Sequence, residues 1–130
     1  MNRHAPTVLV IDQDLGFVWW LGEIFHAAGC KVMPALSCRE ALSLAETANL
    51  TVDLIVVNPA LTGVSGMIKT LRRTRSAKIV AIQHRTLLGG SRLDTHAVLE
   101  RPSQGEPISR AEWLRTVRGI LAQIGARAAS

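Results

Sequence analysis

Short apolar runs alternate with helical patterns along most of the chain. The runs lie at 7–12, 30–35, 54–57, 78–83 and 96–100. Each contains β-branched residues and meets a polar residue or a turn at its end, as is typical of strands buried in a parallel sheet. The run 30–35 includes Pro34, which has no backbone donor and therefore favours an edge strand.

Between these runs, apolar residues recur at spacings of three and four, which predicts helices with one buried face. After Asp14 this pattern extends to Gly29, a residue that commonly ends helices. The pattern places Trp19 on the exposed face of this helix. Trp19 either lies along its own helix or anchors a partner.

Further helices are predicted from their start signals. Two S-x-x-E patterns, Ser37–Glu40 and Ser109–Glu112, match capping boxes that open helices. Another helix is predicted over 67–73. The segment 84–95 should also cross back as a helix, but Gly89–Gly90 interrupts it. Because each glycine costs about 1 kcal/mol in a helix interior, this fourth helix is predicted to be short or irregular.

Five strands alternating with five helical segments predict an α/β fold. The expected architecture is a doubly wound five-stranded parallel sheet with right-handed crossovers and helices on both faces. The chain has 130 residues, of which 48% are hydrophobic and 19% charged. We therefore expect one globular domain, residues 1–130, with a core over about 7–125.

The chain shows no signal for a membrane or for secretion. No apolar run is long enough to cross a bilayer, and the start, MNRHAPT, lacks the apolar segment of a signal peptide. Cys30 and Cys38 match no metal-binding or redox spacing. We expect reduced, buried thiols in a cytoplasmic protein, with a disulfide between them as the alternative.

The net charge of +5 is unevenly distributed, because no acidic residue occurs between Leu54 and Leu93. The basic residues of the 69–78 stretch are Lys69, Arg72, Arg73, Arg75 and Lys78. Such a cluster is either a solvated face or a surface for nucleic acid or another polyanion. The stretch has no recognition-helix motif and no interleaved aromatic residues, which weakens the nucleic-acid interpretation.

Polar residues stand at the carboxyl ends of the predicted strands. They are Asp12 (followed by Gln13 and Asp14), Asn58, Gln83 and Arg101. In open α/β sheets, ligands bind at this edge, so these residues are the candidates for any chemistry. The simpler interpretation is structural: Asp12 as a polar cap and Asn58 as an amide that organises its loop.

The order and spacing of these motifs resemble a bacterial response-regulator receiver domain over nearly the whole length. The resemblance rests on VLVID at the start, DLIVVN with a glycine eight residues later, and a basic residue before Pro102 at the end of the fifth strand. It implies strand order 2-1-3-4-5 and a role in a two-component or phosphorelay pathway. In that family, two adjacent acids after the first strand bind Mg²⁺ together with an aspartate that ends the third strand. This aspartate accepts a phosphoryl group from a histidine kinase, and a Ser/Thr and a Lys on the last two strands contact the phosphoryl oxygens.

Carried over by position, most of these residues are changed. Asp12 keeps the first acid, but Gln13 replaces the second and Asn58 stands at the phosphoacceptor position. Gln83 replaces the hydroxyl residue and Arg101 replaces the lysine. A neutral amide has no anionic oxygen to attack phosphorus, so phosphotransfer at this position is expected to be lost.

The same changes affect the metal site. The carboxylates at the three positions fall from three to one, and Mg²⁺ requires hard, charged oxygens. Asp14 lies beyond the usual pair and is expected at the start of the first helix instead. We therefore expect no bound cofactor and no Mg²⁺.

These expectations together describe a degenerate receiver domain, a non-enzymatic module of bacterial signalling that acts by protein–protein interaction. Trp19 and the basic 69–78 face are the candidate partner surfaces, and the partner is a signalling protein or a second copy of the chain. The alternative is a polyanion-binding or nucleic-acid-binding module that uses the 69–78 face. An enzyme on the same fold is disfavoured, because the sequence has no G-x-S-x-G, no P-loop and no paired nucleophile and base.

Overall fold

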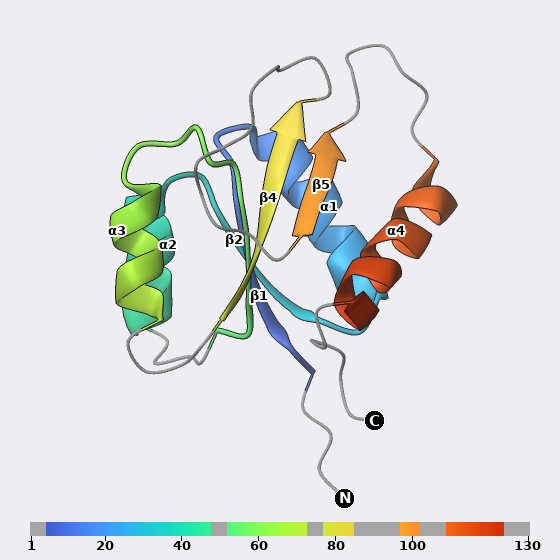
Figure 1. Cartoon of the computed structure of the whole chain (residues 1–130), viewed down its shortest axis with the longest axis horizontal. Coiled ribbons are helices and arrows are strands. Elements are labelled where there is room, and N and C mark those ends of the chain that lie inside the picture. Colours follow the sequence, from blue (N-terminus) through green and yellow to red (C-terminus); the bar gives the residue numbers. More distant parts are fainter. Residues whose placement is uncertain (1–4, 48–51, 73–76, 85–96, 102–108, 124–130) are drawn as a thin grey trace, which may run out of the picture.

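The computed structural model describes residues 5–47, 52–72, 77–84, 97–101 and 109–123 (Figure 1). Within these ranges the elements are β1 Thr7–Ile11, α1 Leu15–Ala27, β2 Lys31–Ala35, α2 Cys38–Thr47, β3 Leu54–Val57, α3 Val64–Leu71, β4 Lys78–His84, β5 Ala97–Arg101 and α4 Arg110–Gln123. The predicted helix over 84–95 lies almost wholly outside the described residues. None of the described helices is long and apolar enough to cross a membrane.

The strands form one parallel sheet in the order β2-β1-β3-β4-β5. This confirms the α/β fold and the strand order. β1 and β3 lie inside the sheet and are buried along their whole length, as their unbroken apolar runs predict. β2 lies at one edge, where the missing donor of Pro34 is tolerated.

The helices form a layer on each face of the sheet. α1 and α4 cover one face and α2 and α3 cover the other (Figure 1). Alternate residues of each strand point to opposite faces. The core therefore divides into two clusters, with Val10 and Val56 under α1 and α4, and Ile11 and Val57 under α2 and α3.

Three of the predicted helix boundaries, at Ser37, Ser109 and Gly29, are confirmed. The Glu40 amide donates to Ser37 Oγ at 3.0 Å, and the Glu112 amide donates to Ser109 Oγ at 3.2 Å. Gly29 follows α1 with φ +96°, a conformation that other residues rarely adopt. Local hydrogen bonds thus fix where the chain enters and leaves its helices.

The start of α3 differs from the prediction. The helix begins at Val64, three residues before the predicted start at Met67. Its N-cap is Gly63, with φ +86° and no side-chain hydrogen bond. Because the N-cap residue is a glycine, no capping side chain marks this helix start in the sequence, and Gly63 and Gly66 resemble a loop.

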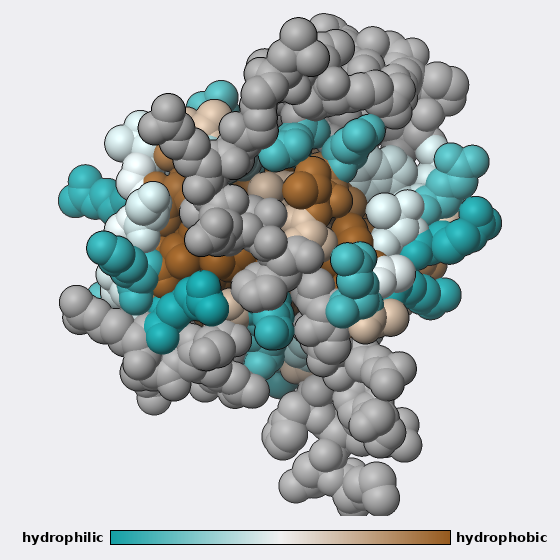
Figure 2. Space-filling view, in the orientation of Figure 1, coloured by the Kyte–Doolittle hydropathy of each residue, from teal (hydrophilic) through white to brown (hydrophobic). Residues whose placement is uncertain are grey.

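The exposed side of the β4–β5 region carries apolar surface. Figure 2 shows apolar side chains toward the middle of this face and hydrophilic ones around them. On β5, Val98 is 46% exposed, whereas Leu99 points into the core under α1 and α4 and is 1% exposed. The two residues show the alternation expected of a strand.

Candidate functional site

The fold brings the predicted strand-end residues to one edge of the sheet. Asp12 follows β1 and Asn58 follows β3, the neighbouring strand. Gln83 lies in β4 and is half-buried, and Arg101 is the last residue of β5, where its backbone pairs with His84. The β3–β4 register pairs Val57 with Ala81, so Gln83 lies two residues beyond the last paired position.

Asp12 and Asp14 form a short hydrogen-bonded link between β1 and α1. Asp12 is fully buried, and its Oδ1 accepts a hydrogen bond from the Asp14 amide at 3.1 Å. Asp14 is the N-cap of α1, and its own Oδ1 accepts from the Phe17 amide at 3.1 Å. The prediction that Asp14 starts the first helix is therefore confirmed. Its carboxylate satisfies one of the free amide donors of the first helical turn.

Asn58 organises the loop after β3. Its Oδ1 accepts a hydrogen bond from the Ala60 amide at 2.9 Å, which closes a turn of the Asx type. Its backbone N–H donates to Ile11 O at 3.0 Å, and its carbonyl accepts from the Leu61 amide at 3.2 Å. The interpretation of Asn58 as a loop-organising amide is confirmed.

The side chains at this edge do not fit a magnesium ion. Gln13 is exposed and Asn58 is half-buried, and both offer neutral amide oxygens. Asp12 supplies the one carboxylate at the three positions, while Asp14 caps α1. Across the described part of the chain, no three His, Cys, Asp or Glu side chains are grouped so that they could hold a metal. Mg²⁺ prefers several charged oxygen ligands in octahedral arrangement, which this set does not provide.

Comparison with known proteins identifies the fold. No protein-family model matches the chain, and no curated protein sequence matches it. Among solved structures, the chemotaxis protein CheY4 of Vibrio cholerae superposes with a TM-score of 0.66 at 19% identity, covering 91% of this chain and 100% of that one. A two-component response regulator from Clostridium difficile gives a TM-score of 0.64 at 19% identity, with 92% and 98% covered. NtrX from Brucella abortus gives 0.67 at 15% identity over 92% of this chain and 27% of NtrX.

The chain has the receiver fold. Solved receiver domains match it over nine-tenths of its length and over nearly all of their own, which agrees with the order β2-β1-β3-β4-β5. At identities of 11 to 23%, this likeness shows the architecture and leaves the chemistry to the side chains. The receiver fold thus supplies the frame in which Asp12 and Asn58 must be interpreted.

A groove beside α1 lies away from the strand ends. It has a volume of about 560 Å³ and lies between the outer side of α1 and the edge strand β2, with one residue from α4. Its lining residues are Val18, Trp19, Gly22, Glu23, His26, Ala27, Val32, Pro34 and Arg110. Trp19 is 61% exposed, which confirms its predicted position on the outer face.

The sequence does not reveal this groove, although it singles out Trp19. At the groove, Gly22 lets α1 approach β2 closely, because a Cβ there would lie 3.3 Å from Val32 Cγ1. A glycine inside an amphipathic helix is the signal that points to such a close approach. The neighbouring residues Trp19 and Trp20 lie on different sides of α1. Trp19 is exposed, whereas Trp20 packs on Trp113 of α4 with ring centroids 4.8 Å apart.

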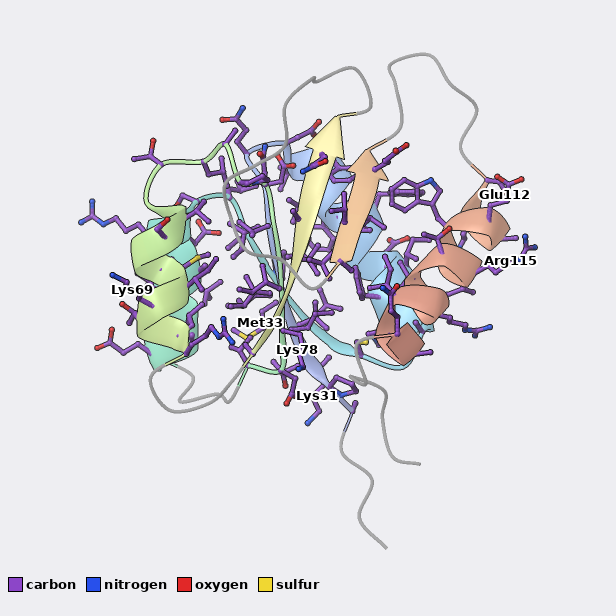
Figure 3. All side chains as sticks on the ribbon, viewed as in Figure 1. Lys31, Met33, Lys69, Lys78, Glu112 and Arg115 are labelled. Atoms are coloured by element: carbon purple, nitrogen blue, oxygen red, sulfur yellow. The ribbon has the colours of Figure 1, made fainter. Side chains whose placement is uncertain are left out.

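The basic residues predicted as one face do not all lie together. Lys69 and Arg72 are exposed on α3 and at its C-cap. Figure 3 shows Lys69 pointing away from the sheet on the outer side of α3, whereas Lys78 lies at the lower end of the sheet. Lys78 is half-buried and is the first residue of β4, so it lies where the strands of the sheet begin. Lys31, the first residue of β2, lies at the same end of the sheet. Arg73 and Arg75 lie outside the described residues.

The two cysteines are free and buried, as predicted. Burial, together with the nearby negative charge of Asp53, raises the pKa of the Cys30 thiol from 9.0 to about 11. Burial also raises the pKa of Cys38. Thiols that hold their protons are poor nucleophiles and poor metal ligands, so neither cysteine is a candidate for chemistry at neutral pH.

Proposed function

We propose that this chain is a receiver-fold module of bacterial two-component signalling that works through protein–protein contacts and is not switched by aspartyl phosphorylation. Three features support the proposal. The fold is that of receiver domains, the Asp14 and Asn58 side chains bond to nearby backbone, and a tryptophan is exposed beside a groove.

The observation that carries the proposal is the Asn58 side chain. It stands at the carboxyl end of β3, where receiver domains carry the phosphoacceptor aspartate. Its Oδ1 is bonded to the Ala60 amide at 2.9 Å. An amide oxygen of this kind has no negative charge with which to attack phosphorus, and Asn58 also serves the turn that follows β3.

The surroundings of Asn58 support the same conclusion. The Asp14 carboxylate caps α1 at 3.1 Å from the Phe17 amide, and Gln13 offers only a neutral amide. The carboxylates that would hold Mg²⁺, the ion that offsets the negative charge of an incoming phosphoryl group, are therefore reduced to Asp12. Signal output then depends on which surface a partner recognises.

The test is phosphorylation by a small-molecule donor. The chain is incubated with acetyl phosphate and Mg²⁺, and its intact mass is measured. We expect no adduct of about 80 Da on the wild-type chain. The matched gain-of-function variant carries Gln13→Asp and Asn58→Asp, which restores the two lost carboxylates. This variant is expected to gain the adduct, which shows that the assay detects phosphorylation on this scaffold.

A wild-type adduct that disappears in Asp12→Ala contradicts the proposal, because it places phosphoryl transfer at the strand ends despite the amide. An adduct that survives this substitution identifies phosphorylation elsewhere on the chain. A far-UV circular dichroism spectrum of each variant confirms that the fold is retained.

A further inference from the structure

We propose that the groove beside α1 is a self-complementary interface through which two copies of this chain form a twofold-symmetric dimer. The inference deepens the interaction part of the proposed function. It does not depend on the loss of phosphorylation, which is tested separately by mass.

Exposed apolar side chains concentrate on the unit formed by α1 and β2. Among the described residues, the large hydrophobic side chains that are at least 36% exposed are Leu15, Trp19, Leu36 and Val98. The first three belong to α1 or directly follow β2. Leu15 and Trp19 are four residues apart and share one helix face. An exposed apolar strip next to a hollow is typical of an interaction site.

The same surface carries both a projecting group and a hollow. Trp19 projects with 61% of its surface exposed. Beside it, Gly22 has no side chain, and Val32 and Pro34 form the β2 side of the groove. A twofold interface brings the same patch of both chains together, so that each projecting residue meets the hollow of the other chain. A volume of about 560 Å³ is large enough to receive an indole ring.

The charges of the groove are also paired in a self-complementary way. Glu23 on α1 and Arg110 on α4 both line it. Across a twofold axis, Glu23 of each chain can face Arg110 of the other, which gives two equivalent ion pairs. A patch with one sign of charge repels its own copy, whereas this patch attracts it. This charge pattern favours a second copy of the chain over a partner of uniform charge.

The dimer does not form by extension of the sheet. The Lys31 amide donates to Pro6 O, and the Asp12 amide donates to Ala35 O, so Lys31 and Ala35 direct their backbone groups toward β1. By the alternation of a strand, Val32 and Pro34 direct theirs to the free edge. Pro34 has no N–H, so a strand added at this edge meets a missing donor. Contact between side chains along α1 is the arrangement that remains for this face.

The first experiment measures association of the full chain. Sedimentation equilibrium across a wide range of protein concentration should show a monomer–dimer equilibrium. Tryptophan emission should shift to shorter wavelength as the concentration rises, because Trp19 leaves water on association. A standard interface buries about 800 Å² on each partner, which is about a tenth of the 8027 Å² surface of this chain.

A truncation series then locates the interface. Trp19→Ala should raise the dimer dissociation constant about 30-fold or more, as expected for a central aromatic anchor. The matched control is Val98→Ala, which truncates an exposed apolar residue at the opposite edge of the sheet and should leave the constant unchanged. A larger effect of Val98→Ala than of Trp19→Ala places the dimer on β5 and overturns the proposal.

Charge reversal tests the twofold pairing directly. Glu23→Arg and Arg110→Glu, each alone, should weaken self-association about tenfold, because like charges then face each other. Mixing these two variants should restore association, since both ion pairs are then of opposite sign in the heterodimer. Glu46→Arg on α2 and Arg115→Glu on the outer side of α4 (Figure 3) are matched controls away from the groove.

Two further outcomes overturn the proposal. A chain that sediments as a monomer at every concentration shows that the groove does not bind a second copy and belongs to a different partner. A dimer whose mixed charge variants are not restored shows that Glu23 and Arg110 do not pair across the interface. Either result leaves the phosphorylation assay unaffected, so failure of this inference is distinguishable from failure of the proposed function.

Discussion

The carboxyl edge of the sheet and the groove beside α1 use their side chains in opposite ways. At the edge, Asp14 and Asn58 bond to backbone amides two or three residues away. At the groove, Trp19 exposes 61% of its surface although the same helix buries Phe25 completely. The edge keeps the receiver architecture but uses its polar groups for local structure. The groove presents a large side chain that the fold itself does not bury.

Fold stability accounts for the side chains at the carboxyl ends of the strands, but it does not account for the exposed Trp19. An N-cap or a turn hydrogen bond stabilises a protein by about 1 kcal/mol, which is reason enough for Asp14 and Asn58 to occupy their positions. An exposed tryptophan contributes little to the core of its own chain. In the proposed dimer, contact with the second copy accounts for its exposure.

The two sides of α1 provide the largest expected difference in stability. Phe25 is fully buried in the cluster under α1 and α4, so Phe25→Ala should lower the free energy of unfolding by about 3–5 kcal/mol. Trp19→Ala should change it by less than about 0.5 kcal/mol in the monomer. Urea denaturation at low protein concentration, followed by circular dichroism, measures both values.

A loss of more than about 2 kcal/mol in Trp19→Ala breaks the comparison. It shows that Trp19 packs within its own chain, as in the alternative in which the indole lies along its helix. Denaturation of the same variant at high concentration is the control, because dimer formation stabilises only the folded state and makes the wild-type midpoint depend on concentration.

The buried Cys30 thiol, which directly precedes β2, should make the protein less stable at high pH. The unfolded Cys30 thiol loses its proton near pH 9.0, whereas the folded thiol, buried and close to Asp53, has a pKa of about 11. Between these values the native state binds more protons, so stability falls as the pH rises. The loss relative to Cys30→Ala should be on the order of 1–2 kcal/mol between pH 8 and pH 11.

Urea denaturation of the wild type and of Cys30→Ala across this pH range measures the difference. The lysines titrate in both proteins, so subtraction leaves the contribution of Cys30. Parallel curves for the two proteins would falsify the assigned shift.

Much of the fold could be predicted from the sequence because its signals are local. The runs before Asp12 and Asn58 are apolar and short, and their polar ends mark the edge of the sheet. The S-x-x-E pattern at Ser37 gives the start of α2, and Gly29 gives the end of α1. Each signal depends only on residues that are neighbours in the chain, so it can be recognised before the packing of the elements is known.

The rest depends on how separate elements meet. α3 begins earlier than predicted, because Gly63 caps it through its backbone conformation and leaves no side-chain signal. The groove is lined by residues of separate elements, where Gly22 of α1 lies close to Val32 of β2. Lys78 follows Lys69 closely in the sequence, yet Lys69 lies on the outer side of α3 and Lys78 lies at the first residue of β4. Charge counted along the chain therefore overestimates a common basic face.

The smallest expected effects concern the strand-end residues. Asp14→Ala should lower the free energy of unfolding by about 1 kcal/mol, because the Phe17 amide loses its cap. Asp14→Asn keeps an acceptor of similar capping strength and should be close to neutral, which makes it the matched control.

Asn58→Ala should lower stability by about 0.5–1 kcal/mol, since the Ala60 amide loses its partner at a half-buried site where water can replace it. Residues kept for function often reduce stability, and their removal then stabilises the fold. If urea denaturation shows that Asn58→Ala is more stable than the wild type, the amide serves a bound partner or ligand and the carboxyl edge joins the groove as a functional surface.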